Sequence, residues 1–186
     1  MPRVSILIPL HNCESTIRRS LDSVYAQDFE DFEIIAILNN CTDNTESILL
    51  EYSDRKQPIK TFYCKVPGIV PTLNTGIPHC TGEFIARQDG DDMWYPTKLR
   101  KQVEFLDANS NIDIVGTQMR QVNAEGKPIQ ASLVHPTEDL QRDENISSNQ
   151  FKASVIQILD LNYLQHYEEN RIADLIFSNC LTRNLG

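Results

Sequence analysis

Two apolar segments near the start of the chain have the pattern of strands buried on both faces. Residues 4–10 (VSILIPL) and 32–38 (FEIIAIL) are rich in β-branched side chains and show little of the polar and apolar alternation that marks a half-exposed strand. Residues 59–64 and 83–87 carry a weaker version of the same pattern. We therefore expect four strands in the first half of the chain.

The segments between these strands have helical periodicity. In residues 14–25, Ile17, Leu21 and Val24 recur on one face of a helix, and charged side chains occupy the other face. Further helices are expected at residues 46–52, within residues 68–79, where two prolines keep the helix short, and at residues 97–108. Alternating strands and helices are typical of an α/β fold with a mainly parallel sheet flanked by helices.

The pattern is weaker in the rest of the chain. Residues 112–122 predict one further strand, which ends in a turn at residues 123–126. Residues 136–149 are polar and acid-rich, as in a loop, and residues 151–177 are expected to form one or two helices.

The length and composition are those of one folded domain. The chain has 186 residues, of which 40% are hydrophobic and 23% charged. We assign residues 1–130 to an α/β core and residues 131–186 to a C-terminal extension of the same domain, of uncertain helical structure.

The chain is acidic, with 26 acidic and 17 basic residues and a formal net charge of -9. This charge opposes docking on a nucleic acid or an anionic membrane surface. Five scattered cysteines without a C-x-x-C pair favour a reducing compartment. The opening residues lack the pattern of a signal peptide, and no apolar run reaches the roughly 20 residues that span a bilayer. We expect a cytoplasmic protein with no nucleic-acid partner.

An acidic cluster follows the fourth expected strand. Asp89, Asp91 and Asp92 lie at the carboxyl end of residues 83–87, with Gly90 allowing the backbone to turn. Ligands of an open α/β sheet bind beyond the carboxyl ends of its strands, and two neighbouring carboxylates can share a hard cation there. The alternative is a solvated acidic turn, which is the commoner explanation of an isolated D-x-D. The position after the fourth expected strand favours the cation only because other loops are expected at the same edge.

Two more loops are expected at the same edge. Residues 11–14 follow the first strand and residues 39–43 follow the second, so both should open on the crevice of the acidic cluster. Asp43 or Thr42 is expected to cap the next helix whatever else the second loop does. His11, taken alone, is more often a structural residue than a catalytic one.

Several short segments occur in a characteristic order. They are residues 4–12 (VSILIPLHN), 14–17 (ESTI), Asn74 with Gly76, residues 81–87 (TGEFIAR), and residues 88–92 (QDGDD) followed by Pro96, Lys98, Leu99, Gln102 and Val103. Each segment is modest, but the ordered set resembles the family two glycosyltransferases of GT-A fold, over about residues 4–130.

This resemblance implies a Rossmann-like, mainly parallel sheet that binds a nucleotide sugar. The implied reaction is transfer of the sugar, from a UDP-sugar above all, with inversion and metal assistance. The implied acceptor is a glycan, a lipid-linked or a small molecule, in assembly of cell-surface polysaccharide. Peripheral association with a membrane-bound acceptor at the inner face of the membrane follows from the same resemblance.

The resemblance also implies roles for individual residues. The implied nucleotide-binding residues are Pro9, Asn12, Glu14, Asn39, Asn74, Arg87 and Asp89. Asp89 and Asp91 are the implied catalytic residues and the ligands of Mg²⁺ or Mn²⁺, with Asp89 approaching the ribose or the donor sugar. Such a cation would stabilise the charge that develops on the departing diphosphate.

The sequence departs from the family pattern in its second loop. Leu38 and Asn39 stand where the family usually carries an aspartate pair, so recognition of the base would rest on an amide oxygen. That acceptor has less charge assistance than a carboxylate, which predicts weaker nucleotide affinity or a different base.

The acidic residue that would accept the acceptor's proton has no recognisable context. The candidates are Glu168, Glu169 and Asp174, and a solvated helix face is the alternative explanation of Glu168 and Glu169. The chain is also short for this family. It is expected to be a truncated chain, a fragment, or a shortened relative without transfer activity.

Two other functions compete with transfer. The first is an inactive module that binds a nucleotide sugar, which would show metal-dependent affinity without turnover. The second is a sugar-nucleotide nucleotidyltransferase. Those enzymes open with a glycine-rich phosphate loop after the first strand, and residues 9–13 (PLHNC) contain no glycine.

Overall fold

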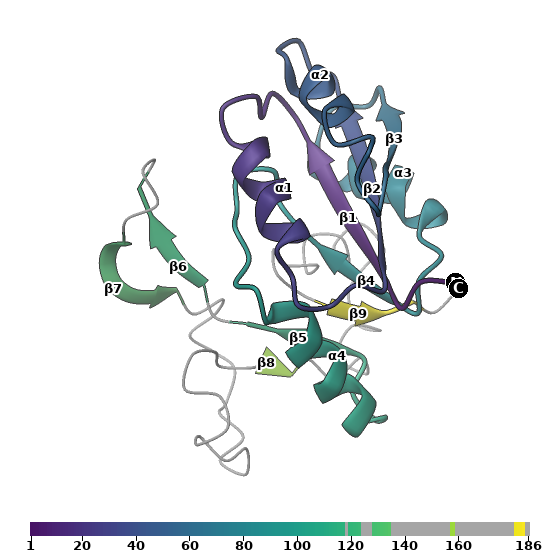
Figure 1. Cartoon of the computed structure of the whole chain (residues 1–186), viewed down its shortest axis with the longest axis vertical. Helices are drawn as coiled ribbons and strands as arrows, with labels where there is room; N and C mark the ends of the chain where they lie inside the picture. Colours follow the sequence, from purple (N-terminus) through teal and green to yellow (C-terminus); the bar gives the residue numbers. More distant parts are fainter. Residues whose placement is uncertain (118, 124–127, 135–156, 159–180, 185–186) are drawn as a thin grey trace.

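The computed structural model describes residues 1–117, 119–123, 128–134, 157–158 and 181–184 (Figure 1). The strands are β1 (Val4–Leu10), β2 (Phe32–Asn39), β3 (Ile59–Cys64), β4 (Phe84–Arg87), β5 (Ile114–Gly116), β6 (Met119–Val122), β7 (Pro128–Val134), β8 (Gln157–Ile158) and β9 (Leu181–Arg183). The helices are α1 (Ile17–Tyr25), α2 (Thr45–Leu50), α3 (Ile69–Gly76) and α4 (Lys98–Ala108), with a 3-10 turn η1 (Ile77–His79). Within the described residues, no helix has the length and apolar character needed to cross a bilayer.

Seven strands form one sheet in the order β3-β2-β1-β4-β9-β5-β8. The pairs β3–β2, β2–β1 and β1–β4 are parallel. Because β9 is antiparallel to both β4 and β5, and β8 is antiparallel to β5, five of the seven strands point the same way. The sheet is therefore mainly parallel, and the carboxyl ends of β2, β1 and β4 lie next to one another at one edge.

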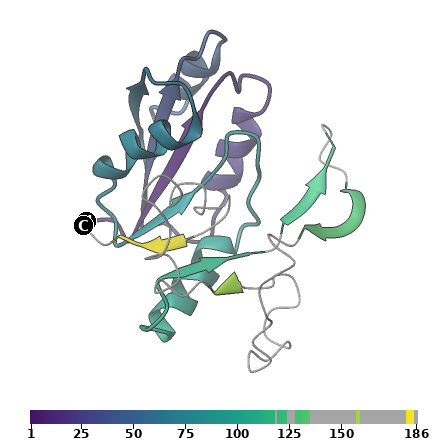
Figure 2. The ribbon, with the colours of Figure 1, turned by 180° about the vertical axis from the view of Figure 1, so that it is seen from behind.

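The two central strands are covered on both faces, which explains their continuous apolar sequence. Every residue of β1 and β2 is buried. Side chains alternate across a strand, so Ile6 and Ile8 pack with residues of α1, α2 and α4, whereas Leu7 packs with Leu73 of α3. Figures 1 and 2 show α1 and α3 on opposite faces of the sheet.

The first four strands and the helices between them occur where the sequence predicts them, with small changes at the helix ends. The largest change is at α1, which begins at Ile17. Residues 14–16 form a turn, closed by bonds from the N–H groups of Thr16 and Ile17 to the carbonyl oxygen of Cys13.

The prediction of one strand over residues 112–122 was wrong. The structure has two strands in this segment: β5 belongs to the main sheet, and β6 pairs with β7 in a separate two-stranded sheet that projects from the main body (Figures 1 and 2). β5 is held by β9, whose Leu181 lies opposite Val115. The alternation of side chains indicates a strand but does not reveal that its two halves have different partners. Residues 124–127, where most of the expected turn falls, lie outside the described part.

The helices expected at residues 151–177 are contradicted at Gln157 and Ile158, which form strand β8. This strand is antiparallel to β5, with Ile158 opposite Val115. Pairing with a strand distant in sequence outweighs local helical spacing here. The other residues of this segment, and the loop expected at residues 136–149, lie outside the described part.

A buried carboxylate ties the sheet together near the amino ends of its strands. Glu33 on β2 is 8% exposed. It accepts hydrogen bonds from Ser5 Oγ on β1 at 2.6 Å, from Lys60 Nζ on β3 at 2.8 Å, and from both the N–H and the hydroxyl of Thr81 at 2.8 Å. Burial acts to raise the pKa of Glu33, but the bonds from Lys60, Ser5 and Thr81 outweigh it and lower the pKa to about 2.

Replacing Glu33 by glutamine is expected to lower the free energy of unfolding at pH 7 by about 2–3 kcal/mol. The substitution removes the negative charge, and the NH2 group of the new amide would face neighbours that themselves donate hydrogen bonds to this position. The folded pKa lies below the unfolded value of 4.5. The stabilisation by Glu33 is therefore complete above pH 4.5 and lost as the pH falls towards 2. Denaturant unfolding at several pH values measures both effects.

Glu104→Gln is the matched control, because Glu104 forms an exposed pair with Arg100 at 3.4 Å. It should change the free energy of unfolding by less than about 0.5 kcal/mol. Equal effects of the two substitutions would show that the buried network does not stabilise the fold.

Candidate functional site

Three loops meet at the carboxyl edge of the sheet. We call residues 11–16 loop 1, residues 40–44 loop 2, and residues 88–92 the acidic turn. They follow β1, β2 and β4 respectively. Because β1 pairs with β2 on one side and with β4 on the other, loop 1 lies between the other two.

Hydrogen bonds join loop 1 to loop 2. Asn12 Oδ1 accepts from the N–H of Thr42 at 2.8 Å, and the N–H of Glu14 donates to Asp43 Oδ2 at 2.9 Å. In the other direction, the carboxylate of Glu14 accepts from the N–H of Asn44 at 2.9 Å. Asn12 has a φ of 51°, in the left-handed region that asparagine tolerates better than most residues. These bonds hold the two loops in one arrangement.

Asp43 also meets the start of the following helix, as expected. Its Oδ1 accepts from the N–H of Thr45, the first residue of α2, at 3.0 Å. The hydroxyl of Thr45 in turn accepts from the N–H of Cys13 at 2.7 Å. The helix start is therefore fixed to both loops.

The acidic turn is anchored on loop 1 and α1 through its backbone. Thr16 Oγ1 donates to the carbonyl of Gly90 at 2.9 Å, and Ser20 Oγ donates to the carbonyl of Asp89 at 3.1 Å. Gln88 is fully buried, and its amide nitrogen donates to Ser20 Oγ at 2.8 Å. The acidic turn therefore lies against the first loop, the arrangement that the cation hypothesis requires.

The two carboxylates of the acidic turn differ in environment. Asp89 Oδ1 accepts a bond from Arg87 Nη2 at 2.7 Å, and both side chains are largely buried. Burial and the negative charge of Asp91 raise the pKa of Asp89, against the lowering effect of Arg87. Asp91 is exposed and lies close enough to raise the pKa of the Cys13 thiol too, although burial is the main cause of that rise.

These side chains fit a divalent cation of a particular kind. Among the described residues, no group of three or more histidine, cysteine or acidic side chains is placed to hold a metal ion. Mg²⁺, however, is commonly bound by one or two carboxylates together with substrate phosphates. Asp89 and Asp91 offer two hard oxygen ligands of this type, so they fit a cation shared with a diphosphate.

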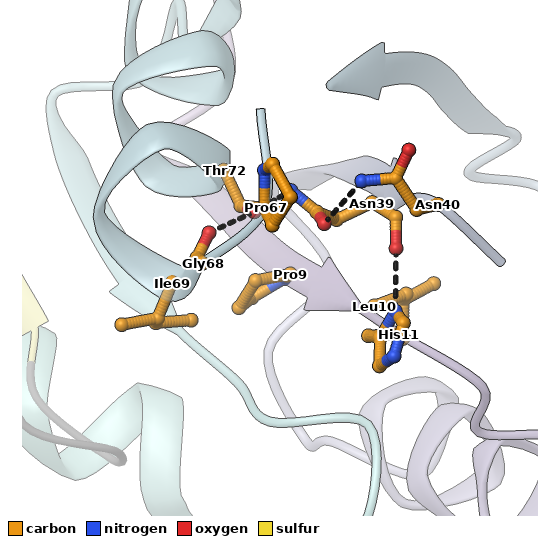
Figure 3. A pocket seen from close by; sticks show the side chains of 9 residues that line it. All are labelled: Pro9, Leu10, His11, Asn39, Asn40, Pro67, Gly68, Ile69 and Thr72. Atoms are coloured by element: carbon orange, nitrogen blue, oxygen red, sulfur yellow. Dashed lines mark hydrogen bonds between the residues drawn. The ribbon is translucent and has the colours of Figure 1, made fainter. Parts of the chain in front are cut away.

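A pocket of about 470 Å³ opens beside loop 1 (Figure 3). Its lining residues come from the ends of β1 and β2 and from the start of α3, and they are Pro9, Leu10, His11, Asn39, Asn40, Pro67, Gly68, Ile69 and Thr72. The volume is within the range of small-molecule sites, and an apolar wall with a few polar groups is typical of them.

The structure brings most of the predicted site residues to this edge. Pro9 and Asn39 line the pocket. Asn12 and Glu14 use their side chains to bind loop 2, and Arg87 pairs with Asp89 in the acidic turn.

One predicted residue that the structure describes is not at the pocket. Asn74 is exposed on α3 and is not among the residues that line the pocket. The candidates for the general base, Glu168, Glu169 and Asp174, lie outside the described part of the chain.

Three supporting residues were missed in the sequence. Thr16 and Ser20 fix the acidic turn, and Thr72 holds Asn39 through a hydrogen bond of 2.7 Å. A signal existed for Ser20, because it lies on the same buried face of α1 as Ile17 and Leu21. A small hydroxyl residue on an apolar helix face predicts a buried polar partner.

Comparison with known proteins gives consistent matches. Residues 5–177 match the family model described as Glycosyl transferase family 2. EpsE of Bacillus subtilis (strain 168), which carries a provisional assignment as a glycosyltransferase, is 38% identical over 122 residues, covering 63% of this chain and 43% of EpsE. The UDP-Glc:alpha-D-GlcNAc-diphosphoundecaprenol beta-1,3-glucosyltransferase WfgD of Escherichia coli is 35% identical over 108 residues, covering 58% of this chain and 42% of WfgD.

Among solved structures, TarS 1–349 of S. aureus in complex with UDP aligns with a TM-score of 0.60 and 27% identity, covering 68% of this chain and 38% of that one. The chain thus spans less than half the length of these relatives. The family match and the structural neighbours agree with one another. The chain belongs to glycosyl transferase family 2 and has the GT-A fold.

Proposed function

We propose that this protein is a metal-assisted glycosyltransferase that uses a UDP-sugar as donor and a glycan or lipid-linked molecule as acceptor, with inversion at the transferred sugar. The observation that carries the proposal is the position of Asp89 and Asp91, which the backbone of the acidic turn fixes against loop 1. The names of relatives support the donor and the acceptor: TarS has been solved with UDP-GlcNAc, and the name of WfgD specifies UDP-Glc and a diphosphoundecaprenol acceptor.

Loop 1 separates two regions that would hold the two halves of a nucleoside diphosphate. His11, at the start of loop 1, lines the pocket, whereas Thr16, at its end, contacts the acidic turn. In this arrangement the nucleoside would occupy the pocket, with the diphosphate directed to Asp89 and Asp91.

Asp89 and Asp91 would hold Mg²⁺ or Mn²⁺, and Arg87 would orient the carboxylate of Asp89. The mannosyltransferase PcManGT from Pyrobaculum calidifontis, a structural neighbour with a TM-score of 0.59 and 25% identity, was solved with GDP-Man and Mn²⁺. When bound, the cation stabilises the negative charge that forms on the departing diphosphate.

Inversion requires that the acceptor hydroxyl loses its proton to a base on the face opposite the leaving group. The proposed candidates for this base are Glu168, Glu169 and Asp174. We also propose that the protein associates peripherally with the inner face of the membrane, because a lipid-linked acceptor would lie there.

The experiment that tests the proposal is calorimetric titration of the full chain with UDP, with Mn²⁺ and then with EDTA. We expect micromolar to millimolar binding with Mn²⁺ and an affinity at least about tenfold lower in EDTA, because the carboxylates then repel the diphosphate. Equal affinity in both buffers would contradict metal assistance. Failure of UDP to bind in either buffer would contradict the proposed function itself.

A further inference from the structure

The side chain of Gln88 closes the acidic turn from within. Gln88 is the first residue of this turn, and its Nε2 donates to the carbonyl oxygen of Asp92, the last residue, at 2.8 Å. The same nitrogen donates to Ser20 Oγ on α1 at 2.8 Å. An amide NH2 group has two protons, so these bonds use both of them. One side chain thus ties the two ends of the acidic turn to each other and to α1.

The orientation of the Gln88 amide follows from its partners. A backbone carbonyl oxygen can only accept, so the amide atom that faces Asp92 is the nitrogen, and the amide oxygen lies on the other side. Among the described residues, Gln88 Oε1 has no hydrogen-bond partner, although the side chain is fully buried. A buried polar atom without a partner destabilises the fold, and an apolar side chain of similar size would avoid this cost. The two bonds made by the nitrogen therefore require an explanation beyond packing.

A second path of hydrogen bonds leads from Gln88 through Ser20 to Asp89. Ser20 is fully buried, and its Oγ donates to the carbonyl oxygen of Asp89 at 3.1 Å. That carbonyl oxygen also accepts from the N–H of Asp92 at 3.2 Å. The backbone is thus held on both sides of Asp91, at Asp89 and at Asp92. Because Asp91 itself is exposed, the position of its carboxylate depends on this backbone.

We infer that Gln88 is a positioning residue for the divalent cation. It is fully buried, so it acts through the acidic turn, whose backbone it holds in an arrangement that lets Asp89 and Asp91 bind one ion. Two carboxylates on a mobile turn repel each other, and bringing them together would then weaken metal binding. A turn that is already closed avoids this loss. The inference rests on the proposed function, since it concerns the metal of the same site.

The substitution that tests the inference is Gln88→Met, and Gln27→Met is the matched control. Methionine is unbranched like glutamine but cannot donate a hydrogen bond. Gln27 is also buried, at 8% exposed, and its Nε2 donates to the carbonyl oxygens of Ser23 and Tyr95 at 3.1 and 2.9 Å. Its Oε1 accepts from the N–H of Leu99 at 3.0 Å. Gln27 therefore makes one more bond than Gln88, but none of its bonds involves the acidic turn.

Calorimetric titration of each full chain with UDP, in Mn²⁺ and in EDTA, gives the factor by which Mn²⁺ tightens binding. This factor should be at least about tenfold in the parent and in Gln27→Met, but within about threefold of unity in Gln88→Met. In EDTA, the three proteins should bind UDP with affinities within about threefold of one another, because the lining of the pocket does not include the acidic turn. In thermal unfolding, Gln27→Met should have the lower midpoint of the two variants, because it loses more bonds.

The outcomes separate the inference from the proposed function. If the parent depends on Mn²⁺ and Gln88→Met retains that dependence, the inference is overturned and the proposed function stands. Loss of the dependence in Gln27→Met as well would also overturn the inference, because a general defect of the fold would then explain both variants. A parent whose UDP affinity is the same in Mn²⁺ and in EDTA would overturn metal assistance and the inference together.

Ser20→Ala tests the same network if Gln88→Met does not fold. It removes the hydroxyl group that accepts from Gln88 and donates to Asp89. The factor by which Mn²⁺ tightens UDP binding should fall by at least about threefold. An unchanged factor in Ser20→Ala would overturn the inference.

Discussion

Replacing Asp91 by asparagine is expected to lower the rate of sugar transfer by at least about 100-fold, the scale of losing one preorganised group that stabilises developing charge. The substitution keeps the size of the side chain but removes its negative charge, and a neutral amide is a poor ligand for a hard cation. Release of UDP from UDP-GlcNAc, measured with saturating Mn²⁺ and an acceptor, reports the rate.

Asp54→Asn is the control for this experiment, since Asp54 is exposed in the turn after α2 and its substitution removes the same charge. It should leave the rate unchanged. If Asp91→Asn retains both the parent rate and the parent's dependence on Mn²⁺, Asp91 is not a metal ligand and the metal assignment is wrong.

The arrangement of Arg87 suggests that the two aspartates do not contribute equally. Arg87 Nη2 already engages Asp89 Oδ1 at 2.7 Å, so part of the charge of Asp89 is neutralised inside the protein. Asp91 has the more exposed carboxylate of the two. A cation would therefore be attracted more strongly to Asp91 than to Asp89, which is why the largest loss of rate is expected on replacing Asp91.

The core of the fold could be predicted because its signals are local. In β1 and β2, the apolar runs alone indicate coverage on both faces, and parallel pairing with β4 then places three loops at one edge. The position of the acidic turn beside loop 1 follows from this topology without knowledge of any individual contact.

The parts that could not be predicted depend on pairing between distant residues. β9 lies between β4 and β5, about 70 residues from β5 in sequence, and its three residues carry too little pattern to reveal it. The same reason explains the error at β8. Periodicity also cannot show where β5 ends and β6 begins, because both have a strand pattern and differ only in the strands they pair with.

In the site too, the residue types could be predicted from the sequence, whereas their contacts could not. The residues of the acidic turn are visible as a motif, but the ion pair of Arg87 with Asp89 is a geometric fact. At Asn39, the sequence shows an amide side chain, and it leaves open which end of the amide contacts neighbouring groups of the protein. That orientation depends on Val66 and Thr72, which are distant in sequence.

Replacing Gly90 by alanine is expected to lower the free energy of unfolding by about 1–3 kcal/mol and to weaken binding of UDP in Mn²⁺ by at least about tenfold. A Cβ atom at this position would lie 2.6 Å from Leu10 Cδ2 and 2.9 Å from Cys13 Sγ. Both distances are shorter than the contact distance of roughly 3.5–4.0 Å between such atoms. Leu10 is 1% exposed and has little room to withdraw. The acidic turn would have to move, and Asp89 and Asp91 would move with it.

A double-mutant cycle with Leu10→Ala separates this steric effect from any other role of Gly90. Leu10→Ala removes the Cδ2 atom that the new methyl group would meet, although it leaves a cavity that destabilises the fold on its own. Because the two side chains would contact each other, Gly90→Ala should be less harmful in the Leu10→Ala background, with a coupling of about 1 kcal/mol in denaturant unfolding. Strict additivity of the two substitutions would show that Leu10 does not limit the position of the acidic turn. Coupling in stability, accompanied by partial recovery of the dependence of UDP binding on Mn²⁺, would connect the close approach of Gly90 to loop 1 directly with the placement of the two carboxylates.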